Sequence, residues 1–193
     1  WNPLDVFLAF DPRQFDRDYK AGVDALRIDI PLGDFSGINI VGVLGRSVDV
    51  LGTYSSDSLA DVSWKGSAVL GRVFTNLWEW DFALQGGKVY GGYQIGGAAT
   101  GELGPVEIRA EAAYLFADDD ERLPLMPEEP VTFDHFTAVL GLGHRFECTL
   151  DIEAEYLYNG AGDGDKLEAA ALRLGGGGSF HMGEHLLGMV ASY

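Results

Sequence analysis

The 193-residue sequence predicts an all-β protein made of antiparallel, up-and-down strands, and three observations lead to this prediction. Apolar and polar residues alternate with a period of two in long runs, as they do in strands whose two faces meet different surroundings. The chain holds 27 glycines, about twice the usual share of ~7%, and many of them fall inside those runs, which suits a curved sheet wall. The links between the runs also alternate between short and long.

Ten runs are predicted to be strands. The clearest alternation lies near residues 24–31, 77–85, 105–117, 135–147 and 149–158. Along 105–117, for example, Ile108 lies on the apolar face, whereas Glu107 and Arg109 lie on the polar face. Weaker alternation marks residues 37–45, 67–74, 88–98, 168–176 and 185–193. Many of these runs hold ~9–11 residues, the length that crosses a bilayer when a strand is tilted.

The expected connections fall into two groups by length. Short links are expected at Gly33–Phe35, Thr75–Asn76, residues 86–88, Thr100–Gly104, Glu147–Thr149 and Gly177–Glu184. Longer links are expected at 46–66, 118–132 and 159–166. Short turns at one end of a sheet and longer loops at the other are typical of outer-membrane barrels, whose short turns face the periplasm.

Aromatic residues gather near the ends of the predicted strands. Trp78 and Trp80 lie by a short link, and Tyr114 and Phe116 lie by a long one. Lipid–water interfaces favour such rings, because one edge is apolar and the other is polar. The sequence therefore predicts an antiparallel up-and-down transmembrane β-barrel, with residues 1–193 as one partial barrel domain. A soluble antiparallel sheet also alternates, but its strands usually hold only ~5–6 residues.

Two short motifs near the start of the chain precede an alternating strand. They are Asn2-Pro3-Leu4-Asp5-Val6-Phe7 and Asp11-Pro12-Arg13, and the strand is Gly22-Val23-Asp24-Ala25-Leu26-Arg27-Ile28-Asp29. This series resembles a loop and a strand of bacterial outer-membrane porin-like proteins. The resemblance implies a location in the outer membrane of Gram-negative bacteria and the passage of small solutes.

Strand parity then predicts which charged residues line a water-filled lumen. The acidic residues are Asp29, Glu79, Asp81, Glu107, Glu111, Glu147, Asp151, Glu153 and Glu155, and the basic residues are Arg27, Arg72, Lys88, Arg109, Arg145 and Arg173. We expect passive diffusion of small hydrophilic solutes or ions through this lumen, with the lipid bilayer as partner and a homo-oligomer possible. The alternatives are a structural, adhesin or plugged receptor barrel in the outer membrane, and a soluble ligand-binding β-barrel.

Neither catalysis nor a cofactor is expected, and the charge argues against a nucleic-acid partner. The formal net charge is −17, whereas phosphate binding needs a basic face. Acidic loop residues are weak candidates for a calcium site: Asp118, Asp119, Asp120, Asp163 and Asp165. Their spacing does not match an EF-hand loop, so solvated acidic loops are the favoured interpretation.

The direction of the predicted strands suggests that the chain is an internal fragment. If short turns are periplasmic, strand 24–31 runs towards the periplasm, and the tenth strand, 185–193, runs away from it. Even strand numbers and periplasmic termini then predict at least twelve strands in the natural protein. We expect an open sheet with 24–31 and 185–193 at its edges. The preceding segment, 1–22, is expected to be an extracellular or inward-folded loop.

Overall fold

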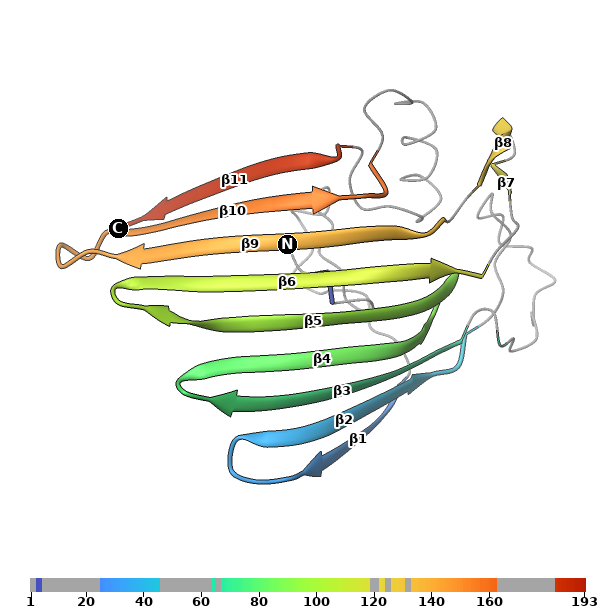
Figure 1. Cartoon of the computed structure of the whole chain (residues 1–193), viewed down its shortest axis with the longest axis horizontal. Coiled ribbons are helices and arrows are strands. Elements are labelled where there is room, and N and C mark those ends of the chain that lie inside the picture. Colours follow the sequence, from blue (N-terminus) through green and yellow to red (C-terminus); the bar gives the residue numbers. More distant parts are fainter. Residues whose placement is uncertain are drawn as a thin grey trace.

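The computed structural model is all-β, and its largest element is a single curved sheet (Figure 1). The structure describes residues 3–4, 25–45, 64, 67–118, 122–123, 126–130, 133–162 and 183–193. Nine strands form the sheet: β1 Ala25–Pro31, β2 Ser36–Val43, β3 Ala68–Leu77, β4 Trp80–Val89, β5 Gly92–Leu103, β6 Val106–Ala117, β9 His135–Arg145, β10 Asp151–Asn159 and β11 His185–Ser192. Helices are absent from the described residues.

The nine strands follow one another across the sheet in chain order, and every neighbouring pair is antiparallel. A separate two-stranded hairpin, β7 Arg122–Leu123 with β8 Met126–Pro130, lies between β6 and β9 in the chain. The up-and-down order predicted from the sequence is therefore confirmed for this part of the chain.

Short and long connections lie at opposite ends of the sheet (Figure 1). The turn end carries the links 32–35, 78–79, 104–105 and 146–150. The loop end carries the links 44–67, 90–91, 118–134 and 160–184. The predicted segregation of connection lengths is confirmed, with one tight link at the loop end.

Two predicted turn positions are wrong, and a third begins too early. The β3–β4 turn is Trp78–Glu79 rather than Thr75–Asn76, and both turn residues have positive φ, 54° and 65°. Positive φ at both central residues is the mark of a type I′ hairpin. Trp and Glu adopt it rarely, so the sequence carries no signal for this turn.

Glycine explains the other two errors. The predicted link at residues 86–88 lies inside β4, and the turn follows at Tyr90–Gly91. Glycines inside β4 belong to the curved wall and not to a turn. Strand β5 likewise runs past Thr100, and the chain turns only at Gly104, where φ is 62°.

The order of the last strands also differs from the prediction. Strand β10 pairs with β9 along one edge and with β11 along the other, so no strand lies between 149–158 and 185–193 in the sheet. The predicted strand 168–176 lies outside the described residues. Because β11 is antiparallel to β10, it runs towards the turn end, opposite to the predicted direction. The expectation of at least twelve strands depended on that direction and loses its basis.

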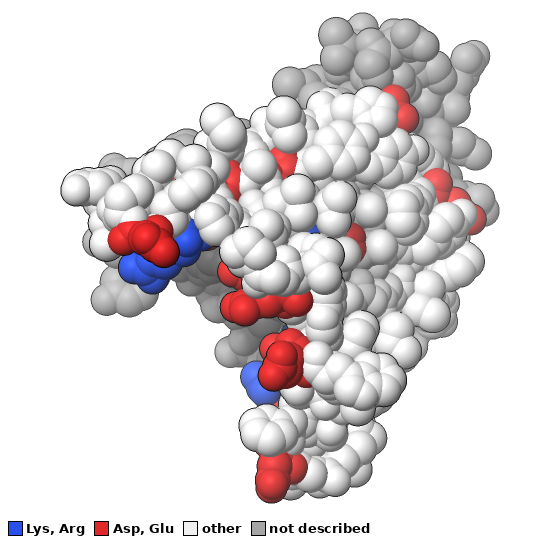
Figure 2. All heavy atoms as spheres, turned by 60° about the vertical axis from the view of Figure 1, so that its left-hand side comes forward, with Lys and Arg blue, Asp and Glu red and all other residues white. Residues whose placement is uncertain are grey.

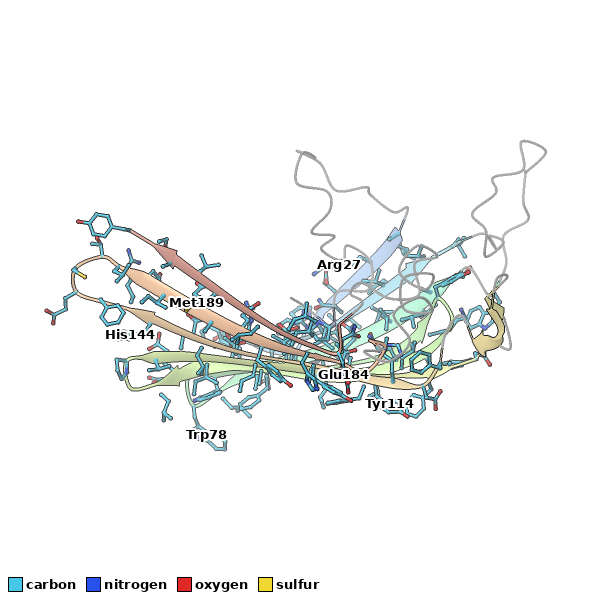
Figure 3. The ribbon with its side chains drawn as sticks, turned by 90° about the horizontal axis from the view of Figure 1, so that it is seen from above. Arg27, Trp78, Tyr114, His144, Glu184 and Met189 are labelled. Atoms are coloured by element: carbon cyan, nitrogen blue, oxygen red, sulfur yellow. The ribbon has the colours of Figure 1, made fainter. Side chains whose placement is uncertain are left out.

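The sheet is open, with β1 and β11 at its two edges, as the sequence predicted. Across the described residues these two strands pair only with β2 and β10. The structure therefore shows a curved, nine-stranded antiparallel sheet in place of a closed barrel. Figure 3 shows the curvature, with Trp78 and Tyr114 on the convex side and Arg27 on the concave side.

The register gives the two faces opposite chemistry. Alternate residues of every strand form the convex face, and an exposed apolar side chain comes from each of the nine strands: Ile28, Ile40, Val73, Leu84, Ile95, Phe116, Leu140, Tyr156 and Leu187. The concave face holds charged residues, most of them towards the turn end. Towards the loop end lies a small apolar core, in which Leu70, Ala113, Val139 and Leu157 are buried.

Candidate functional site on the concave face

Most of the predicted lumen residues lie on the concave face. The strand register places eleven of them on this face: Arg27, Asp29, Arg72, Asp81, Glu107, Arg109, Glu111, Arg145, Asp151, Glu153 and Glu155. Glu79 and Glu147 lie in turns at the turn end, and Arg173 lies outside the described residues. Figure 2 shows charged atoms gathered along the turn end, beside a broad surface that carries almost no charge.

Lys88 is the exception among the predicted lumen bases. The register pairs it with Val69 and Tyr93, whose exposed side chains belong to the convex face. Its ammonium group is buried and donates hydrogen bonds to the carbonyl oxygens of Ser67, at 2.9 Å, and Val89, at 3.0 Å. The ammonium also lies 5.6 Å from the ring centroid of Trp64. Lys88 therefore ties the end of β4 to neighbouring backbone and does not line the concave face.

A shallow trough runs along β9 on the concave face. Gly141 and Gly143 occupy two successive concave positions of β9, between β6 and β10. Glu107 and Arg109 border the trough on β6, and Glu153 and Glu155 border it on β10. The hollow is shallow and open to solvent. It exists because the two glycines carry no side chain between the flanking charged residues.

One ion pair bridges this trough. The guanidinium of Arg109 contacts the carboxylate of Glu155, and the register places Gly141 between them. Two strand spacings separate the partner backbones, roughly 9.6 Å, so the contact requires long side chains and an empty position between them. The side chains of Arg109 and Glu155 are 39% and 22% exposed, so water reaches the pair. Arg109 is the one basic side chain among the residues that line the trough, and this pair holds it against Glu155 on the opposite side.

The remaining charges of the trough are acidic. Glu107 and Glu153 face each other across Gly143, and Glu111 lies one concave position from Arg109 along β6. Three glutamates therefore line the trough with one arginine, which is already paired with Glu155. Close carboxylates give a local negative potential, which favours cations over anions near this wall.

A second charged group lies near the β1 edge. Arg27 Nε contacts Asp29 Oδ1 at 2.8 Å, and the Asn39 amide also donates to this carboxylate. The register places Arg72 beside Asn39 on the next strand. Both members of the Arg27–Asp29 pair are more than half exposed, and exposed pairs contribute little to stability. Their effect is to present balanced charge at this end of the concave face.

The calcium candidates do not form a described cluster. Asp118 follows β6, and its backbone N–H donates to the carbonyl oxygen of Gly91 at 2.9 Å. The other four candidates, Asp119, Asp120, Asp163 and Asp165, lie outside the described residues. In the part of the chain that the structure covers, no group of three or more His, Cys, Asp or Glu side chains is placed to hold a metal ion.

Two features of the concave face escaped the sequence analysis. The first is the trough, whose signal is the Gly141-Leu142-Gly143 alternation, with both glycines on the polar face. The second is a contact between the concave face and the start of the chain, made through Gln85 and Gln94. Neutral amides at strand positions carry no sequence signal for such a contact.

Comparison with protein-family models, curated proteins and solved structures found no match to this chain. Within the described residues, no helix has the length and apolar character needed to span a membrane. The described part of the chain thus belongs to a structural class, the curved antiparallel sheet with one apolar and one charged face.

Proposed function

We propose that the chain forms the wall of a porin-like channel, through which small hydrophilic solutes or ions diffuse passively across the bacterial outer membrane. One observation carries the proposal: an exposed apolar face spans all nine strands, with a charged face behind it. Leu84, Ile95 and Leu187 are 71%, 58% and 79% exposed on that face. Soluble monomers rarely expose apolar patches larger than a few hundred Å², so a lipid environment explains this surface best.

Strand lengths support the same proposal. The six central strands, from β3 to β6 and then β9 and β10, hold 9 to 12 residues each. A tilted strand of ~9–11 residues spans the apolar part of a bilayer. Within the sheet, every strand between β1 and β11 pairs with a neighbour on both sides, as the interior of a membrane-spanning sheet requires.

Aromatic rings lie at both ends of the convex face. At the loop end the ring centroids of Phe136 and Tyr158 are 6.2 Å apart, and Tyr114 and Phe116 are 4.7 Å apart. At the turn end His144 and Phe146 make an edge contact at 4.3 Å. Ten residues separate Phe136 from Phe146, or about 33 Å at ~3.3 Å per residue. A strand tilt of ~40° reduces this to roughly 25 Å, the height of the apolar band in membrane barrels.

The concave face supplies what a water-filled lumen needs. It carries Arg, Asp and Glu side chains that are accessible to solvent, and no reacting group is required for passive diffusion. The acidic excess around Arg109 leads us to expect modest cation selectivity. Charged walls bias which ions enter but do not exclude neutral solutes.

Reconstitution tests the proposal. The full-length protein should require detergent for extraction, refold into lipid vesicles and produce stepwise conductance in planar bilayers. A chain that stays monodisperse in buffer without detergent would be a soluble ligand-binding protein, and the proposal would be wrong. A chain that inserts but never conducts would be a structural or plugged barrel, which also contradicts the channel.

A further inference from the structure

The dipeptide Pro3–Leu4 lies against the concave face, far in sequence from the strands that it touches. Its contacts are with β4 and β5, more than 80 residues further along the chain. Leu4 is 8% exposed and is therefore buried against the concave face. A described segment outside the strands therefore occupies space in front of the sheet.

Two glutamines hold the backbone of this dipeptide. Gln85 on β4 donates from Nε2 to the carbonyl oxygen of Leu4 at 2.8 Å. Gln94 on β5 donates from Nε2 to the carbonyl oxygen of Pro3 at 3.2 Å. The two amides also approach each other, with 3.5 Å between Gln85 Nε2 and Gln94 Oε1. Two successive carbonyl groups are thus bound by two neighbouring side chains, which fixes the position of the chain and its direction.

The side chain of Leu4 fits over a glycine. A Cβ atom on Gly96 would lie 2.6 Å from Leu4 Cδ2, closer than any real contact of that kind. Gly96 is in register with Gln85 on one side and with Ala113 on the other, and Ala113 is buried. The apolar contact and the two hydrogen bonds therefore form one docking surface, defined by Gln85, Gln94, Gly96 and Ala113.

The docking surface lies next to charged residues of the concave face. Along β6, Ala113 is one concave position from Glu111 and two from Arg109. We propose that Pro3–Leu4 is an anchored strap that occupies part of the lumen beside these charges and limits its conductance. This inference rests on the proposed channel function. The docking of Pro3–Leu4 on the sheet does not depend on that function and can be tested separately.

Thiol chemistry tests the docking. In a Cys148→Ser background, Leu4→Cys should react with a water-soluble maleimide much more slowly in the folded protein than in urea. The additional changes Gln85→Ala and Gln94→Ala should accelerate the reaction about tenfold, because two hydrogen bonds of ordinary net strength are lost. Asn76→Ala is the matched control, since its amide donates to Asp81 on the same sheet without contacting the strap. Equal rates in folded and unfolded protein would overturn the docking.

Planar-bilayer recordings test the effect on the lumen. The Gln85→Ala/Gln94→Ala protein should show a larger or noisier unit conductance than the wild type. Ser36→Ala should not, because the Ser36 hydroxyl hydrogen-bonds that of Thr75 on the convex face. A protected thiol together with unchanged conductance in the double variant would overturn the limiting role of the strap. A protected thiol in a protein that never conducts would overturn the channel function and leave the docking supported.

Discussion

Arg109 on β6 and Glu155 on β10 form an ion pair across an entire intervening strand, because Gly141 on β9 leaves the space between them empty. The pair ties three strands together on the concave face. It also pairs the guanidinium at the level of Gly141, so that Glu107 and Glu153, which face each other across Gly143, give the trough a negative charge there.

Filling the trough should separate this pair. An alanine Cβ at position 141 would lie 3.6 Å from Arg109 Cβ and from Glu155 Cγ, an ordinary contact, so Gly141→Ala should be nearly neutral. Gly141→Leu should cost about 1–3 kcal/mol, because the larger side chain displaces both partners. Urea titrations of the protein in lipid vesicles measure the difference. Similar stabilities for the two variants would show that the trough has room for a leucine and that the ion pair does not depend on it.

A charge on the convex face should destabilise the inserted protein. Ile108 is in register with Gly101 and Leu142 on that face. Ile108→Arg should cost ~2–4 kcal/mol if the residue lies near the bilayer midplane. Glu107→Gln, on the neighbouring residue but the opposite face, should cost far less. Equal costs in a membrane-refolding titration would contradict the assignment of the two faces.

The acidic trough should give modest cation selectivity. Under a KCl gradient the reversal potential should have the sign for cation preference and should shrink as salt rises towards 1 M, where the screening length is ~3 Å. The double variant Glu107→Gln/Glu153→Gln should move the reversal potential towards zero. Glu184→Gln, which lies outside the trough, should not. Anion preference in the wild type would mean that the arginines control the lumen.

The position of the Trp80 ring should depend on the absence of a side chain at Gly101. An added Cβ at Gly101 would lie 2.4 Å from Trp80 Cδ2, whereas an added Cβ at Gly33 meets nothing within 4 Å. Gly101→Ala should therefore cost about 1–3 kcal/mol and alter the tryptophan fluorescence, and Gly33→Ala should do neither. Both variants replace glycine with alanine, so a difference between their stabilities measures the effect of the contact with the Trp80 ring. If Gly101→Ala changed neither the stability nor the fluorescence, the Trp80 ring would not lie against that glycine.

The period of two in the sequence determined the class of fold and the two faces of the sheet. Ile108 and Glu107 are assigned to opposite faces by parity alone, because successive side chains of a strand point to opposite sides. The length of the alternating runs likewise predicts long strands, and β5 and β6 reach 12 residues each. These properties are local, so the sequence of each segment predicts them without information about distant residues.

The tertiary structure decided which residues meet. The Arg109–Glu155 pair depends on the registers of β6 with β9 and of β9 with β10, and no local pattern contains either register. The turn at Trp78–Glu79 is set by how β3 pairs with β4, against the backbone preference of both residues. The docking of Leu4 beside Gln85 joins positions 81 residues apart. Contacts of this kind follow from strand pairing, which is a property of the whole sheet and not of any one segment.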